Sequence, residues 1–311
     1  MEWSDTPIRL TYIVGTGRSG STVIDSFLGN HPSIQSVGEL ARLLNDAWTN
    51  DYYCSCGKRS SSCTFWSAVH QGWCELNGGV TVEQYAGLQS RFEQLRRWPF
   101  LSRERWKDSE DFQSYAKQTR LLLRAIQNTS GCKMIVDSSK GVERAYALAQ
   151  IPGIDLRVIH LVRDPRGVVW SHKKAFKKDL RGGLPSDIEP EPTWRAALYW
   201  CRLNLQAEWL RKYLGKDRSV LVRYEDFMQH TRPVMEQVGR LMDVDFEPLL
   251  QVTEQDGTFN FSHTIAGNRV RMKGQLRLKF DEEWREKLET RDRRITEALS
   301  GWLMARYGYR I

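Results

Sequence analysis

Residues 12–22, YIVGTGRSGST, join an apolar strand to a glycine-rich turn and then to the start of a helix. Gly15, Gly17 and Gly20 let the backbone approach an anion closely, and the helix N-terminus adds amide donors and a positive dipole end. The segment therefore predicts a phosphate-binding loop. The spacing from Gly15 to Gly20 matches the first part of a Walker A loop, but Ser21 stands where that loop has its lysine. This substitution argues against an ordinary ATPase or kinase.

The residues around this loop resemble the sulfotransferase family. The apolar strand, the sequence GRSGST at residues 17–22 and an amphipathic helix are followed by His31-Pro32 and then by Gly38-Glu39. Members of this family take a sulfuryl group from 3'-phosphoadenosine 5'-phosphosulfate (PAPS) and release adenosine 3',5'-bisphosphate. The resemblance implies that the loop binds the 5'-phosphosulfate through Gly17, Arg18, Ser19, Gly20, Ser21 and Thr22.

A second motif stands downstream, where the same family has one. The apolar segment 156–162 precedes Arg163-Asp164-Pro165, and Ser171 follows eight residues after Arg163. The resemblance implies that Arg163 and Ser171 bind the 3'-phosphate, a role that suits arginine because its guanidinium forms paired bonds with phosphate. A looser third element implies further contacts from Lys273 and Gly274, although Met272 departs from the family's more common pattern.

Sulfuryl transfer requires a cation near the leaving oxygen, donors for the transferring group and a general base for the acceptor hydroxyl. Arg18 is the candidate cation. Lys140, after a predicted strand, resembles a lysine that reaches the transferring group in relatives. Glu39 is the candidate base because the region resembles Gly-Glu-Glu of protein-tyrosine sulfotransferases, although their second glutamate, the base, is Leu40 here. His263 is the alternative base, because other branches of the family use a histidine.

Strands that alternate with helices predict an α/β fold, a P-loop-like three-layer arrangement with a central parallel sheet flanked by helices. We expect strands at 10–15, 34–37, 133–136, 156–162 and 219–222, and the main helices at 83–97, 110–128, 142–150, 193–213, 232–242 and 281–307. Residues 1–311 are interpreted as one domain with a mostly helical insertion at about 41–130. Residues 177–192, charged and rich in Gly and Pro, are interpreted as a mobile loop over the cleft.

The composition is that of a soluble globular protein: 41% of the 311 residues are hydrophobic and 27% are charged. No apolar run approaches the ~20 residues of a membrane span, and residues 1–10 do not resemble a signal peptide, so we expect a cytoplasmic protein. The net charge of +8 suits a bisphosphorylated donor. Because dense basic tracts and RNA-binding signatures are missing from the sequence, nucleic acid is not an expected partner.

Three cysteines cluster in the sequence at Cys54, Cys56 and Cys63, and His70 follows them. The C-x-C spacing is poor for a zinc site, and no second paired element follows. We therefore interpret the segment as structural, with free thiols or a local disulfide, and expect no metal.

The sequence thus predicts an O-sulfotransferase that uses PAPS. The reaction would be a direct in-line displacement by a hydroxyl of a small-molecule natural product, a carbohydrate or a lipid alcohol. Two alternatives stay open: a kinase-like P-loop phosphotransferase, with Asp137 as its magnesium ligand, and a nucleotide-binding module without turnover.

Overall fold

The computed structural model describes residues 6–93, 104–255 and 257–310. Within these residues the central feature is a sheet of five parallel strands in the order β2-β3-β1-β4-β5. The strands are β1 (Ile8–Gly15), β2 (Ile34–Ser36), β3 (Met134–Lys140), β4 (Ile154–Val162) and β5 (Ser219–Arg223). The predicted α/β fold with a parallel sheet is therefore confirmed.

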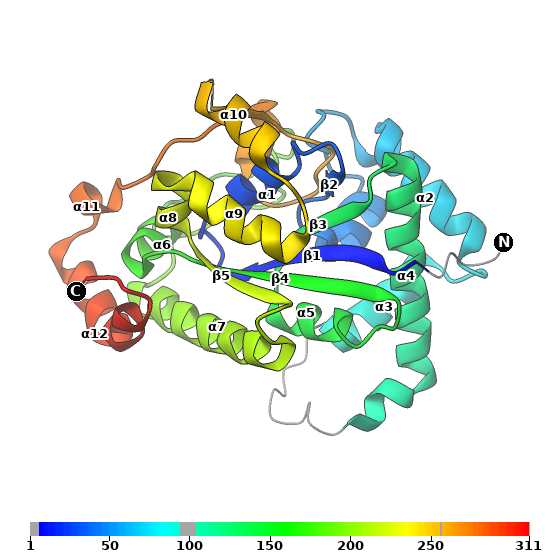
Figure 1. The fold of residues 1–311 in the computed structure, drawn as a ribbon, viewed down its shortest axis with the longest axis horizontal. Helices are drawn as coiled ribbons and strands as arrows, with labels where there is room; N and C mark the ends of the chain where they lie inside the picture. The colour runs from blue at the N-terminus through cyan, green and yellow to red at the C-terminus, as the bar shows by residue number, and fades with distance from the viewer. Residues whose placement is uncertain (1–5, 94–103, 256, 311) are drawn as a thin grey trace.

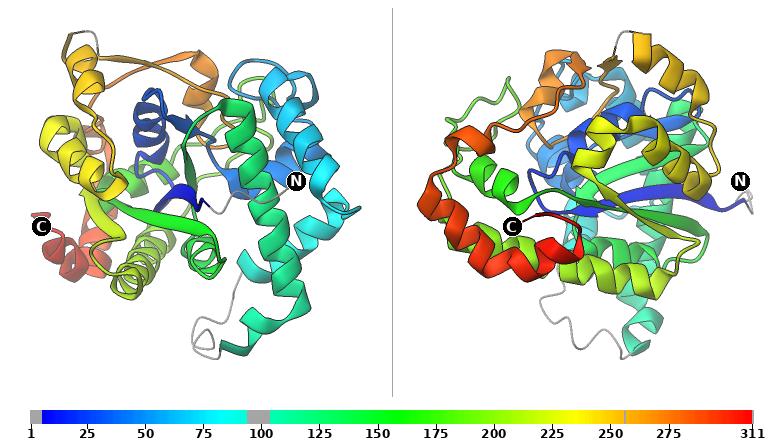
Figure 2. Two further views of the ribbon diagram at one scale, coloured as in Figure 1. Left: turned by 45° about the vertical axis from the view of Figure 1, so that its right-hand side comes forward. Right: turned by 60° about the vertical axis from the view of Figure 1, so that its left-hand side comes forward.

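Helices cover both faces of the sheet (Figure 1). One face carries α4 (Glu110–Ser130), α5 (Val142–Leu148) and α7 (Thr193–Leu214), and the other carries α1 (Ser21–Leu28), α8 (Tyr224–Gln229) and α9 (Thr231–Met242). Figure 2 shows α2 (Thr64–Leu76) and α3 (Val82–Glu93) beside α4 at one end of the molecule. At the opposite end, α12 (Thr290–Arg306) packs against α7 and α6 (Pro165–His172).

The alternation of side chains along β1 explains how this strand joins the two halves of the core. Leu10, Tyr12 and Val14 pack into the cluster under α4, α5 and α7, whereas Ile13 packs into the cluster under α1 and α9. Successive side chains of a strand point to opposite faces, so an almost continuously apolar strand is required when helices cover both faces. The same reasoning applies to the apolar run of β4.

Some predicted elements differ from the structure. Helix α2, within the cysteine-rich region, was not predicted, and residues 94–97 of one predicted helix lie outside the described residues. No helix or strand was predicted between residues 243 and 280, but the structure has α10 (Glu247–Gln255) there and an antiparallel pair, β6 (Thr258–Asn260) and β7 (Gln275–Arg277). The expected final helix is divided into α11 (Trp284–Lys287) and α12.

The carboxyl ends of β1, β3 and β4 lie side by side at one edge of the sheet, because the three strands are adjacent and parallel. Ligands of open α/β sheets bind beyond such strand ends. The predicted site residues Arg18, Lys140 and Arg163 follow or end these three strands. Among the described residues, no helix is both long and apolar enough to cross a membrane.

Candidate active site

The glycine-rich loop connects β1 to α1 in a conformation that leaves the helix start open to an anion. Gly20 is the residue before the first turn and adopts a left-handed φ of 89°. Its carbonyl accepts a hydrogen bond from the amide of Val23 at 2.9 Å, and it has no side chain with which to cap the helix. Inside the loop, the hydroxyls of Thr16 and Ser19 are 2.5 Å apart. The amides of the first helical turn are therefore available to phosphate or sulfate oxygens.

Gly20 is required for a second reason, the closeness of the Tyr224 ring. A Cβ at position 20 would lie 2.4 Å from Cδ2 of Tyr224. We expect Gly20→Ala to lower the free energy of unfolding by about 1–3 kcal/mol, because it combines left-handed strain with a steric clash. Gly17→Ala is the matched control, since a Cβ there meets no atom within 4 Å. Urea unfolding of both variants checks this prediction, and equal stabilities would contradict it.

Arg163 lies directly beneath the loop. Its guanidinium donates a hydrogen bond of 3.1 Å to the carbonyl of Arg18 and lies over the ring of Tyr224, 4.7 Å from the centroid. It also donates to the backbone carbonyl and the carboxylate of Asp281, at 3.0 and 3.2 Å. Arg163 is only 7% exposed, so its charge acts in a partly desolvated place. The residue thus connects the glycine-rich loop to the C-terminal part of the chain.

Ser171 lies on the same face of α6 as Gly167, the residue against which the Arg163 side chain packs. A Cβ on Gly167 would lie 3.1 Å from Nε of Arg163, and Ser171 comes four residues later in the helix. Residues four apart are neighbours on a helix surface. Ser171 is half-buried. The geometry is therefore compatible with the expected pairing of Arg163 and Ser171 on one phosphate.

Glu39 and Lys140 meet at the strand ends and form an ion pair. Lys140 has a left-handed φ of 71° and also donates to the carbonyl of Ser138 at 3.2 Å. The backbone amide of Glu39 donates to the carbonyl of Ile265 at 2.9 Å. Both partners are mostly buried, with side chains 19% and 16% exposed. The structure therefore brings together the candidate base and a candidate cation that are about a hundred residues apart in the sequence.

The Glu39 carboxylate also lies close to the glycine-rich loop. A Cβ built on Gly267 would be 3.3 Å from Oε1 of Glu39 and 3.7 Å from the hydroxyl oxygen of Thr22. Arg18 is near enough to Glu39 to interact with it electrostatically, although burial lowers the pKa of the Arg18 guanidinium. The glycine-rich loop and the Glu39–Lys140 pair thus lie at one site.

A cavity of about 300 Å³ opens beside this site. Glu39 forms part of its wall, together with Tyr52, Tyr53 and Arg271. Residues 180–188, within the loop that we interpreted as a cover for the cleft, close another side. Two antiparallel bridges, Phe176 with Ile188 and Asp179 with Leu184, give this loop a hairpin-like shape. The cavity therefore places a space for a second molecule next to Glu39.

The structure also gives the surroundings of the remaining candidates, His263, Lys273 and Gly274, whose roles stay predictions. His263 directs Nδ1 toward the sulfurs of Cys63 and Cys54, at 3.3 and 3.8 Å, and its ring stacks on Phe65. Lys273 and Gly274 are exposed, whereas Arg271 of the same segment is buried at the cavity. His70, which follows the three cysteines in the sequence, packs on the ring of Trp48, with centroids 4.6 Å apart.

Asp137 is engaged within the protein. Its Oδ1 accepts from the amide of Ser139 at 2.9 Å, and its Oδ2 accepts from Nε of Arg144 at 3.1 Å. The side chains of Asp137 and Arg144 are both almost fully buried. Asp137 therefore positions the end of β3, and this arrangement does not favour the magnesium ligand that a kinase-like enzyme would need.

Several contacts to the loop come from residues that could not be selected from the sequence. His172 and Tyr199 lie against the backbone of Gly17. Phe176 lies near Arg18 and Arg269, with its ring centroid 6.0 and 4.3 Å from the two guanidinium carbons. These contacts join segments that are far apart in the sequence, and no local motif marks them.

Known proteins provide an independent comparison. The chain is 26% identical over 175 residues to carbohydrate sulfotransferase 5 of Mus musculus, a match that covers 53% of this chain and 44% of that protein. It is 29% identical over 184 residues to carbohydrate sulfotransferase 3 of Homo sapiens, covering 55% and 37%. The matched regions thus span less than half the length of these relatives.

Solved structures show the same fold. The sulfotransferase domain from the curacin biosynthetic pathway aligns with a TM-score of 0.50 and 19% identity, covering 99% of this chain and 100% of that one. A sulfotransferase from Mycobacterium avium aligns with a TM-score of 0.50 and 15% identity, covering 99% and 79%. The model for the sulfotransferase family matches residues 11–248, which include Arg18, Glu39, Lys140 and Arg163. This chain belongs to the sulfotransferase family.

Proposed function

We propose that this protein transfers a sulfuryl group from PAPS to the hydroxyl of an acceptor bound in the cavity beside Glu39. The observation that carries the proposal is the meeting of the phosphate loop, the Glu39–Lys140 pair and this cavity at one edge of the sheet. An anionic donor, a general base and an acceptor space are the components that the reaction needs.

The residues fit a donor with two phosphate-like ends. The open amides after Gly20 and the hydroxyls of Ser21 and Thr22 suit the 5'-phosphosulfate. Arg163 and Ser171 suit the 3'-phosphate, since a buried guanidinium provides charge-assisted donors. Arg18 and Lys140 provide cations near the point where the leaving oxygen gains charge.

The proposed reaction is one in-line displacement. Glu39 accepts the proton of the acceptor hydroxyl as that oxygen forms its bond to sulfur. The bond between sulfur and the bridging phosphate oxygen breaks, and adenosine 3',5'-bisphosphate leaves with the electron pair. The loop amides contact the transferring group, and Lys140 neutralises the leaving oxygen. The chain's contribution is mainly position and electrostatic stabilisation.

The cavity suggests an acceptor rich in hydroxyl groups. Its wall combines the tyrosine rings of Tyr52 and Tyr53 with charged groups from Arg42, Asp46 and Arg271. Such a wall suits a carbohydrate or a hydroxylated natural product, and a lipid alcohol with a polar head is a further candidate. The names of the matched carbohydrate sulfotransferases support the first of these classes.

Calorimetric binding tests the donor class. We expect micromolar binding of adenosine 3',5'-bisphosphate and at least about tenfold weaker binding of AMP, which lacks the phosphate that pairs with Arg163. Magnesium should not change either affinity. Stronger binding of ATP with magnesium would instead favour the kinase-like alternative. Transfer of labelled sulfate to a panel of carbohydrates, natural products and lipid alcohols then distinguishes an enzyme from a binding module.

A further inference from the structure

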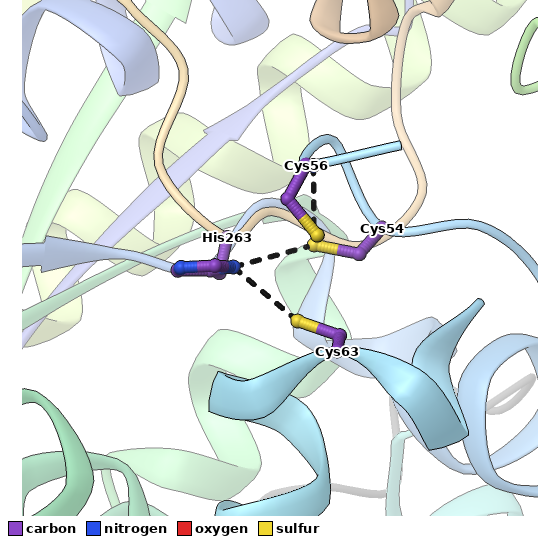
Figure 3. Close-up of side chains that lie close together, drawn as sticks. All are labelled: Cys54, Cys56, Cys63 and His263. Carbon is purple, nitrogen blue, oxygen red and sulfur yellow. Dashed lines mark hydrogen bonds between the residues drawn. The ribbon is translucent and has the colours of Figure 1, made fainter. Parts of the chain in front are cut away.

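Four possible metal ligands lie together outside the proposed active site. Cys54, Cys56, Cys63 and His263 place their sulfur and nitrogen atoms within 4.8 Å of one another (Figure 3). All three cysteines are present as free thiols. We propose that these four side chains bind one zinc ion with a structural role. This assignment replaces our expectation, from the sequence spacing alone, that the cysteines bind no metal.

The distances fit a tetrahedral zinc site. Zinc lies about 2.3 Å from thiolate sulfur and about 2.0–2.1 Å from imidazole nitrogen, so a tetrahedron separates sulfur from nitrogen by ~3.6 Å. The observed separations from Nδ1 of His263 are 3.3 Å to Cys63 and 3.8 Å to Cys54. A site of three cysteines and one histidine is a common ligand set of structural zinc, which is closed by four protein ligands.

A tight turn prepares two of the ligands. The amide of Cys54 donates to the carbonyl of Lys58 at 2.9 Å, and Gly57, with a left-handed φ of 81°, donates to the carbonyl of Cys54. The amide of Cys56 lies 3.5 Å from the sulfur of Cys54 and points toward it as a donor. Amide donors to a ligating sulfur favour its thiolate form and fix its direction. The turn therefore directs the sulfur atoms of Cys54 and Cys56 toward the same proposed metal position.

The other two ligands reach this point from distant parts of the chain. Cys63 is the residue before α2, and His263 follows β6. Ser55 joins the turn to the histidine segment through two hydrogen bonds. The amide of Ser55 donates to the carbonyl of Thr264 at 3.1 Å, and the hydroxyl of Ser55 accepts from the amide of Thr264 at 2.9 Å. His263 is about two hundred residues from the cysteines, which explains why the sequence spacing did not indicate a fourth ligand.

The surroundings compensate the charge of the proposed site. Three thiolates and one zinc ion have a net charge of −1. Arg271 is only 3% exposed and interacts electrostatically with Cys54. Its Nη1 donates to the carbonyl of Thr264 at 3.3 Å. A buried cation therefore lies next to the ligands, as expected for a metal site with excess negative charge.

The position of the cluster indicates what the zinc would stabilise. His263 lies two residues before Ile265, which donates its amide to the carbonyl of Val37 at 3.1 Å and accepts from the amide of Glu39. A metal at His263 would hold residues 262–267 against the cysteine turn and α2. It would thereby fix the backbone that supports Glu39, without touching the reacting groups.

The test is the zinc content of the full chain, purified under reducing conditions and incubated with zinc chloride before excess metal is removed. We expect one zinc per chain. Cys63→Ser and His263→Ala should reduce the content to background, whereas Cys74→Ser and Cys132→Ser, which lie outside the cluster, should retain one zinc. Neither PAPS nor an acceptor is present, so the result does not depend on the proposed function.

A second measurement uses the unsubstituted protein, in case a cysteine variant does not fold. Removal of zinc with a chelator should increase the number of thiols that react with a thiol reagent by three, and zinc but not magnesium should protect them again. Cobalt in place of zinc should give the absorption bands of a tetrahedral thiolate site. Zinc content at background in the unsubstituted protein, or peptide mapping that finds a disulfide between two of the three cysteines, would overturn the proposal.

Discussion

We expect Glu39→Gln to reduce kcat for sulfuryl transfer by about 10²–10⁴-fold and to leave the Kd of adenosine 3',5'-bisphosphate almost unchanged. The magnitude is that expected when a general base loses its ability to accept a proton. Glutamine has nearly the same shape, and its amide oxygen can still accept a hydrogen bond from Lys140. We expect binding of the bisphosphate to depend instead on the loop and Arg163, which the substitution does not touch. Steady-state kinetics and calorimetry on the same preparation measure the two quantities.

The control for this prediction must distinguish Glu39 from His263. If Glu39→Gln retains near-normal turnover and His263→Ala does not, Glu39 is excluded as the base and His263 becomes the candidate. Because His263 is also a proposed zinc ligand, Cys63→Ser is needed beside it: this variant loses the metal but retains the imidazole. A base at His263 predicts loss in His263→Ala alone, whereas an indirect effect of the metal predicts similar loss in both. Glu247→Gln, at an exposed ion pair that is not among the residues lining the cavity, serves as a carboxylate control.

The sequence predicted the sheet well because its information is local. The near-continuous apolar runs of β1 and β4 can only be buried between two layers of helices, and Gly20 marks where β1 gives way to α1. The order of the strands in the sheet could not be predicted, because the residues of a strand do not specify which strand lies beside it. The same limit applies to β6 and β7, three residues each, whose pairing is visible only when the chain is folded.

At the candidate site too, residues beside strand ends could be predicted from the sequence, whereas contacts between distant segments could not. Arg18, Lys140 and Arg163 stand next to strand ends in the sequence, and the parallel sheet brings these ends to one edge. Their chemical roles stay predictions. Asp281, Arg271 and the contact between His263 and the cysteines could not be predicted, because each arises when a C-terminal segment packs on residues more than one hundred positions earlier. A spacing rule for metal sites compares ligands that are close in the sequence, so it could not include His263.

The second prediction with a large effect concerns the hydrogen-bond partner of the Arg163 guanidinium. In the structure Nη2 of Arg163 donates to the carboxylate of Asp281, whose side chain is 40% exposed. The 3'-phosphate would take the place of this carboxylate and gain a charge-assisted pair of bonds. Asp281→Asn should therefore increase the affinity for adenosine 3',5'-bisphosphate a few-fold, because the phosphate no longer displaces a carboxylate.

Arg163→Ala has the opposite and larger expected effect. Loss of hydrogen bonds from a charged donor to phosphate costs about 2–3 kcal/mol, which corresponds to roughly 30- to 150-fold weaker binding of adenosine 3',5'-bisphosphate. AMP lacks the 3'-phosphate, so its Kd should change by less than about threefold. Arg163→Lys should fall between these limits, since lysine keeps the charge but not the two-pronged geometry. Calorimetry with both nucleotides measures the difference.

The comparison of the two nucleotides is decisive because Arg163 also supports the loop through the carbonyl of Arg18. A residue that acted only through this support would weaken adenosine 3',5'-bisphosphate and AMP equally, because both place a 5'-phosphate in the loop. Equal losses in Arg163→Ala would therefore remove Arg163 from the 3'-phosphate site while leaving its structural role. A selective loss for the bisphosphate, together with the gain in Asp281→Asn, is the result that only direct contact with the 3'-phosphate explains.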